Sequence, residues 1–290
     1  MQLGKLLEEL YAGLGLQVLR RAATDGSTTT VVDTGIKNRR GDKYYSQGTK
    51  GGHILFVSQT TDRAAPEGQF GEVSDFTLST TTPTFTVPTM TAVVQAGDIY
   101  AVMKPVIGIY EMISRVNAGL RRLPALEKTD VSLTTAASTL VYSLPLAVGA
   151  YEILSLEIGN DTDGWEDARG LCVTPMSGSS LDKLIFTTQP RYDPATAANC
   201  TIKIRYLAKH PTLSAYSDYV EKSVADELAI AVCAEAAYEY LMTQRPAWFN
   251  DKNRIGVLSF IKQKKEEATL LNPVRMKPAS RLPRITLGEL

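Results

Sequence analysis

Residues 223–243 have the sequence SVADELAIAVCAEAAYEYLMT, and this stretch decides how the rest of the chain is organised. Its many alanines favour a helix and leave little side chain on its surface, so a second helix can approach closely. Ser223, followed three residues later by Asp226, is an imperfect capping box and predicts the helix start. We therefore expect this helix to form the centre of a small helical hub.

Three other segments have helical periodicity, namely 2–13, 104–123 and 251–271. Each is too short or too lightly apolar to form a domain, so we expect them to meet around the alanine-rich helix. Pro105 stands where proline favours a helix start, and Pro124 marks the end of that helix. The first segment has a leucine stripe at positions Leu3, Leu6, Leu7, Leu10 and Leu14. The candidate hub-packing side chains are Ile113, Val116, Leu228, Val232, Ala236 and Leu241.

Two long threonine-rich stretches, 15–103 and 129–209, have strand periodicity instead. The first predicts five or six short strands, which suit a small β-barrel or sandwich. The second predicts about six antiparallel strands in a sandwich of jelly-roll type, and 202–208 is its clearest strand. There, apolar residues alternate with Lys203 and Arg205, so one face is expected to be buried and the other wet. The predicted fold class is α+β, a helical bundle hub with two inserted antiparallel β modules.

The chain ends in a segment, 273–290, that has no helical or strand period and contains three prolines. Such a segment cannot fold alone, and its interleaved apolar residues favour docking on a neighbour. Its candidate docking residues are Arg275, Met276, Lys277, Arg281, Leu282, Arg284, Ile285 and Leu287. The predicted organisation is a hub helix at 1–14, a β module at 15–103, a hub helix at 104–124, a second β module at 125–215, hub helices at 216–272 and the docking tail at 273–290.

Composition limits the possible functions of the 290 residues. Hydrophobic residues make up 44% and charged residues 21%, as in globular proteins. Lys+Arg and Asp+Glu both number 31, so the molecule as a whole is not an electrostatic partner for nucleic acid. No apolar run approaches the roughly 20 residues of a membrane helix. Glu8 and Glu9 stand where a secretory signal would be apolar, so we expect no signal peptide.

The residue types needed for common catalytic and metal sites are sparse. Three cysteines include no CxxC pair; Cys172 and Cys200 could pair across strands, although buried free thiols fit better. The two histidines, His53 and His210, are far apart, which argues against a catalytic triad or a multi-histidine metal site. We therefore expect no catalytic residues, metal or cofactor, and no enzymatic activity.

Three short motifs suggest ligands at first sight. Residues 160–164, NDTDG, imitate a calcium loop but lack carboxylates at its two ends, so we interpret them as a turn. Residues 35–43, GIKNRRGDK, lack the GK[ST] ending and helix of a phosphate loop. Their basic cluster suits a solvated hairpin tip better than a patch facing DNA or a partner. Trp165 and Trp248 suit packing better than a sugar platform.

Three sets of residues resemble the head-to-tail connector (adaptor, head-completion or neck) proteins of tailed bacteriophages. Residues 24–34 (TDGSTTTVVDT), with 68–73 (GQFGEV) and 95–100 (QAGDIY), resemble a β module common in phage virion proteins. Residues 202–214 (IKIRYLAKHPTLS) resemble the last strand and turn of the second module in such chains. Residues 236–241 (AAYEYL) are similar to the end of the connector hub helix.

The resemblance implies a structural virion protein, assembled in the host cytoplasm and located at the head–tail neck. It implies a homo-oligomeric ring, commonly of twelve copies, mounted beneath the portal protein. DNA would pass through the lumen without sequence-specific binding, the β modules would face tail or tail-nozzle proteins, and the C-terminal tail would reach the portal. The two large β stretches exceed what minimal adaptors contain.

Two other functions stay open at this stage. The chain could be another virion component, such as a baseplate or fibre-attachment protein that recognises partners through its β modules. A function of a different class is a carbohydrate-binding β-sandwich, which would require exposed aromatic side chains beside a facing carboxylate pair. The mass of the purified protein, alone and with portal, separates these hypotheses.

Overall fold

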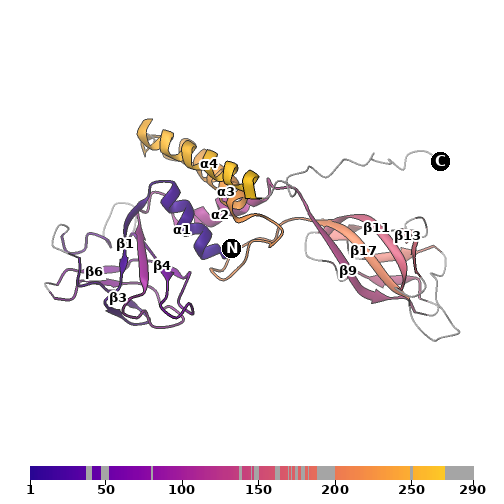
Figure 1. Cartoon of the computed structure of the whole chain (residues 1–290), viewed down its shortest axis with the longest axis horizontal. Helices are drawn as coiled ribbons and strands as arrows, with labels where there is room; N and C mark the ends of the chain where they lie inside the picture. The colour runs from indigo at the N-terminus through magenta and orange to yellow at the C-terminus, as the bar shows by residue number, and fades with distance from the viewer. Residues whose placement is uncertain are drawn as a thin grey trace. The chain divides into compact units, whose positions relative to one another are not determined.

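The computed structural model describes residues 1–36, 41–46, 52–79, 81–136, 139–144, 146, 150–160, 164–168, 170, 172–173, 176–177, 180–181, 183–187, 200–248 and 251–271. The chain divides into two compact units (Figure 1). Unit 1 comprises Met1–Leu123 and Thr212–Leu290, and unit 2 comprises Pro124–Pro211. The fold is mixed α+β with antiparallel sheets.

The α-helices of the described residues all belong to unit 1. They are α1 (Leu3–Gly13), α2 (Ile109–Leu120), α3 (Asp226–Gln244) and α4 (Asp251–Leu271), with a short 3-10 helix at Pro246–Trp248. Within the described part of the chain, none is both long and apolar enough to cross a membrane. The helical segments predicted from periodicity are therefore present, although two of them begin later than expected.

The late starts correct two predictions about capping. Helix α2 begins at Ile109 with Gly108 as its N-cap, so Pro105 lies in the preceding turn and not at the first helical position. Helix α3 begins at Asp226 with Ala225 as its N-cap and no side-chain cap, so Ser223 does not form a capping box. Asp226 instead accepts a hydrogen bond from the Met1 amino group at 2.9 Å. A partial sequence match to a cap was not enough to fix either boundary.

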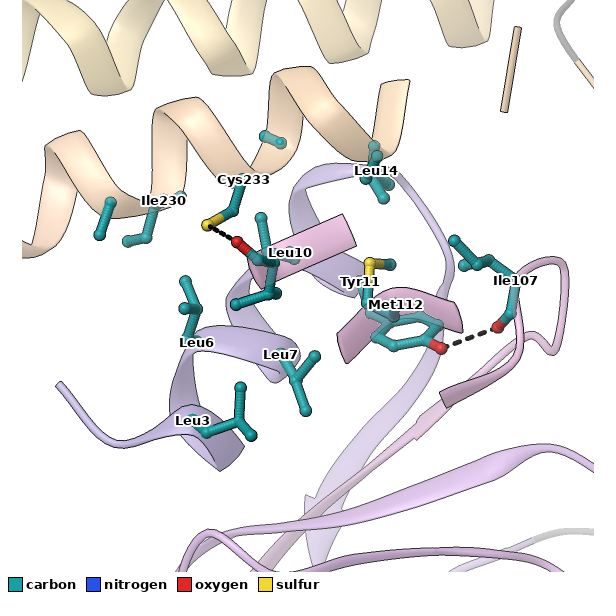
Figure 2. Close-up of a cluster of buried hydrophobic side chains, with 14 of the residues drawn as sticks. Leu3, Leu6, Leu7, Leu10, Tyr11, Leu14, Ile107, Met112, Ile230 and Cys233 are labelled. Atoms are coloured by element: carbon teal, nitrogen blue, oxygen red, sulfur yellow. Dashed lines mark hydrogen bonds between the residues drawn. The ribbon is translucent and has the colours of Figure 1, made fainter. Parts of the chain in front are cut away.

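The leucine stripe of α1 is fully buried, as its spacing predicts. These side chains belong to one cluster with Ile230 and Cys233 of α3, and Figure 2 shows Leu6 and Leu10 on the side of α1 nearest to α3. Tyr11 donates a hydrogen bond to the Ile107 carbonyl at 2.7 Å, and burial raises the pKa of this phenol. One apolar cluster thus contains residues of all four helices, although α1 and α3 are more than 200 residues apart.

The first β region forms two four-stranded sheets and no closed barrel among the described strands, which corrects the barrel prediction. One sheet has the order β1 (Gln17–Ala22), β8 (Ile99–Met103), β4 (Ile54–Gln59), β5 (Phe70–Glu72). The other has the order β2 (Asp25–Gly26), β3 (Thr30–Val32), β7 (Thr84–Thr86), β6 (Asp75–Thr77). Both sheets are open because each ends in two edge strands.

The central strands β4 and β8 are buried on both faces. Ile54 and Phe56 belong to the helical cluster, whereas Leu55 and Val57 belong to a second cluster shared with the other sheet. Successive side chains of a strand point to opposite faces, so β4 separates helices on one side from a sheet on the other. This explains the unbroken apolar run ILFV at 54–57, since a strand covered on both faces has no wet side.

Unit 2 is built on a sheet with the order β12 (Gly164–Asp167), β11 (Ala150–Asn160), β17 (Thr201–Ala208), β9 (Leu126–Thr134). A smaller sheet has the order β10 (Val141–Ser143), β16 (Lys183–Phe186), β13 (Cys172–Val173), and a ribbon pairs β14 (Met176–Ser177) with β15 (Ser180–Leu181). Both sheets contribute to one apolar cluster. The alternation predicted in β17 is confirmed, with Ile202 and Ile204 fully buried and Arg205 exposed.

Candidate interaction surfaces

The six predicted hub-packing residues all lie on α2 and α3. Val116 and Leu241 are fully buried, Val232 and Ala236 are nearly so, and Ile113 and Leu228 are partly buried against the helical cluster. Within the described chain, these residues fill the interior of unit 1. A contact with another molecule would therefore use other side chains of the same helices.

The close approach of α2 and α3 depends on Gly119, a residue that the sequence pattern does not single out. A Cβ atom at Gly119 would lie 2.7 Å from the Cα of Cys233 and 2.8 Å from the carbonyl oxygen of Val232. The Cys233 thiol donates to the Val116 carbonyl at 3.5 Å, and burial raises its pKa (Figure 2). The alanine-rich surface of α3 thus meets a glycine of α2 at backbone contact.

Two sets of polar contacts join α2 and the residues just after it to the segment that contains α3. The Asn117 amide of α2 donates to the Leu213 carbonyl and accepts from the Leu213 N–H, both at 2.8 Å. Arg122, two residues after the end of α2, donates to both carboxylate oxygens of Glu239 on α3, and this bond holds the pKa of Glu239 below its usual value. These bonds join the segments on either side of unit 2, so the two parts of unit 1 form one body.

Helix α4 carries two apolar stripes. The first stripe, Val257, Ile261 and Ala268, is buried and joins α4 to α3. The second, which we call the outer stripe, consists of Ile255, Leu258 and Leu270, which are 68%, 44% and 80% exposed. With about 100° per residue, the outer stripe points roughly 130° away from the first. It is therefore an apolar surface that the described part of the chain does not cover.

A shallow groove of about 540 Å³ runs along this helix. Its described lining residues are Leu258, Ile261, Lys262, Lys265, Glu266, Thr269 and Leu270. All of them belong to α4, so the described residues supply a single wall. The groove contains two ammonium groups, those of Lys262 and Lys265. Lys265 donates a hydrogen bond to Glu235 of α3, and this ion pair neutralises its charge.

The eight candidate docking residues of the C-terminal tail, Arg275, Met276, Lys277, Arg281, Leu282, Arg284, Ile285 and Leu287, lie outside the described residues. Residues 37–40, which make up most of the basic cluster, and the turn residues 161–163 also lie outside the described residues. Lys43, from the edge of that cluster, donates to Asp75 at 2.8 Å.

The proposed sugar platform has little free aromatic surface. The Lys203 ammonium lies 5.0 Å from the centre of the Trp165 ring, and the same group pairs with Glu157 at 3.0 Å. A cation above the ring occupies the face on which a sugar would stack. Trp248, the other tryptophan, is packed against the helical cluster of unit 1. Neither indole therefore favours a carbohydrate site.

The histidines and cysteines serve structural contacts. His53 is bonded through Nδ1 to the Tyr45 carbonyl, and His210 through Nε2 to the Pro124 carbonyl. Cys200 and Cys233 are free and buried. No group of three or more potential metal-ligating side chains occurs among the described residues. These residues thus add no candidate for a catalytic or metal site.

Two features were not predicted from the sequence. Asp33, 1% exposed, accepts hydrogen bonds from Arg21 at 2.6 Å, Tyr100 at 2.7 Å and the Gly35 N–H at 2.8 Å. Tyr110, on α2, is 85% exposed. The partners of Asp33 come from β1, β8 and a loop, so only the tertiary fold brings them together. Tyr110 could have been found because it lies one position after the start of a helix whose buried side chains are Met112, Val116 and Leu120.

Comparison of the sequence with protein-family models and with curated proteins gave no match.

Proposed function

We propose that the chain is a structural virion protein, one subunit of a homo-oligomeric ring, commonly of twelve copies, between the portal and the tail of a tailed phage. In this proposal the helices of unit 1 form the hub of the ring around the DNA channel. Residues 15–103, which contain both four-stranded sheets of unit 1, and unit 2 are the two β modules, and they supply contacts with tail or tail-nozzle proteins. The C-terminal tail reaches the portal, and the protein has no enzymatic role.

The observation that carries the proposal is the arrangement of the helices. Four helices from separate parts of the sequence share one apolar cluster, while long β segments are inserted between them. A chain built in this way combines a helical centre with inserted sheets that could supply recognition surfaces. The outer stripe of α4 adds an apolar surface of the kind that subunits bury on assembly.

The first test is the mass of the purified protein by native mass spectrometry, alone and after mixing with portal protein. The proposal expects a ring, formed either spontaneously or only on the portal, and electron micrographs should place it at the neck of the particle. A particle labelled at the baseplate or fibres would replace the neck role with another virion role. A strict monomer that ignores portal and binds glycans would refute the proposal.

The second test removes the tail. Deletion of 273–290 should leave the fold intact, because the clusters of unit 1 and unit 2 form within residues 1–271, yet it should abolish attachment to portal-bearing capsids. Two matched full-length variants separate the contribution of charge to capsid attachment from that of apolar contact. One changes the four basic residues Arg275, Lys277, Arg281 and Arg284 to glutamine, and the other changes Met276, Leu282, Ile285 and Leu287 to serine. Unchanged capsid attachment by the truncated chain would contradict the docking role.

A further inference from the structure

The outer stripe of α4 is unusual because its large apolar side chains are exposed to solvent. Ile255 and Leu270 are more exposed than any other aliphatic side chains among the large hydrophobic residues that the structure places at the surface. They lie at opposite ends of a 21-residue helix, with Leu258 between them on the same side. The outer stripe therefore extends about 22 Å along α4, with Lys262 and Glu266 between Leu258 and Leu270 on the same side.

The sequence that follows α4 is suited to cover this line. Nineteen residues, 272–290, follow Leu271, and Pro273 is a residue type that disfavours continuation of a helix. An extended segment advances roughly 3.3 Å per residue, so residues 272–290 can span about 60 Å, twice the length of α4. Six large apolar residues are spread along this segment, at Val274, Met276, Leu282, Ile285, Leu287 and Leu290.

We propose that in the unassembled protein residues 272–290 fold back along α4 of the same chain and cover its outer stripe. The distance from Leu270 to Ile255 along the helix, about 22 Å, corresponds to about seven extended residues, so the segment is long enough to cover the whole outer stripe. The segment supplies the second wall of the groove, for which the described residues provide only α4.

The charges of the groove are compatible with this occupant. Lys265 is bonded to Glu235 and Lys264 to Glu267, so neither ammonium group is uncompensated. Among the described residues, Glu266 pairs only with the Lys262 ammonium, at 3.7 Å, and its side chain is 63% exposed. It is therefore the carboxylate most able to accept a hydrogen bond from an arginine of the basic segment.

Covalent attachment favours the chain's own segment over a second copy. A short flexible connection gives an effective concentration of roughly millimolar, which an independent molecule reaches only at very high protein concentration. The covered state does not depend on the proposed ring. If the ring proposal holds, the apolar residues that would contact the portal are masked by α4 until the portal competes for them, so a free subunit does not expose them.

The test is site-specific photo-crosslinking in the full-length protein. Leu258 is replaced by p-benzoylphenylalanine, the purified protein is irradiated, and the linked peptides are identified by mass spectrometry. We expect links to residues 274–287 within one chain, at the mass of a monomer and with a yield independent of protein concentration. The same photo-reactive residue in place of Tyr110, the exposed side chain of α2, is the matched control and should give no such links.

A pair of charge variants makes the test specific for the stripe. With the photo-reactive residue at Leu270, Ile255→Glu together with Leu258→Glu should lower the intrachain yield roughly tenfold. Ser114→Glu, at an exposed position of α2 and therefore off the stripe, should leave it unchanged. Links to the helices or the tail of another copy, equal links from Tyr110, or a yield insensitive to the two glutamates would overturn the inference. Because no portal is present, none of these outcomes bears on the ring.

Discussion

Replacing Gly119 by alanine should destabilise unit 1 by about 2 kcal/mol, although the same change stabilises most helix interiors. Alanine has the better helix propensity, by about 1 kcal/mol. Against this, the added methyl group would lie 2.7 Å from the Cα of Cys233 and 2.9 Å from its backbone nitrogen. These are backbone atoms of α3, so no side chain can rotate away. Helices α2 and α3 would have to separate by almost 1 Å, and such overpacking costs roughly 3 kcal/mol or somewhat more.

The chain contains a matched control for this change. At Gly256, on α4, an added Cβ atom would have no heavy atom within 4 Å, so Gly256→Ala should stabilise the protein by about 1 kcal/mol. Urea denaturation measures both variants. In a Trp165→Phe background, fluorescence comes from Trp248 and reports on unit 1, because Trp165 belongs to unit 2. If Gly119→Ala stabilises the protein as much as Gly256→Ala does, the close contact between α2 and α3 is wrong.

Two further changes test buried polar groups. Asp33→Asn should lower the free energy of unfolding by roughly 2 kcal/mol in the same urea assay, because an amide cannot accept from Arg21, Tyr100 and the backbone together; unchanged stability would refute the network. Burial raises the pKa of Glu8 above 4.5, although the Ser58 hydroxyl that donates to it opposes this shift. The folded state therefore binds this proton more tightly, and stability should fall as the pH rises from 4.5 through the raised pKa. Glu8→Gln should abolish that loss in thermal melts at a series of pH values, and a parallel pH profile for both proteins would contradict the raised pKa.

Sequence periodicity predicts the local structure well where one side of an element is buried. The leucine stripe of α1 and the alternation in β17 each specify a single buried face, and both are confirmed. Helix α4 shows where this reasoning stops. Its apolar spacing groups Ile255, Leu258 and Ile261 together, yet only Ile261 joins the core. A helix with two apolar stripes does not itself determine which stripe meets its neighbour.

The sequence pattern could not predict contacts between distant segments. Strand β1 pairs with β8, about eighty residues later, and nothing in either strand names its partner. The distinction between a barrel and two open sheets depends on such pairings, so the barrel prediction failed there. Gly119 was missed for the same reason, because a glycine within a helix gains its significance only from the backbone that lies against it. The predicted tail residues stay a prediction, since they lie outside the described part of the chain.

The sharing of one cluster by α1 and α3 also affects synthesis on the ribosome. The N–H groups of Leu3 and Gly4 donate to the carbonyls of Asp218 and Tyr216, so the first helix completes its contacts only after more than 200 further residues have been made. At roughly 5–20 residues per second, the leucine stripe of α1 can meet β4, β8 and α2 early, but it waits at least about ten seconds for α3. Unit 2 is continuous in sequence and can finish folding during that interval. The burial of α1 is thus begun by the first half of the chain and completed only by a segment made after unit 2.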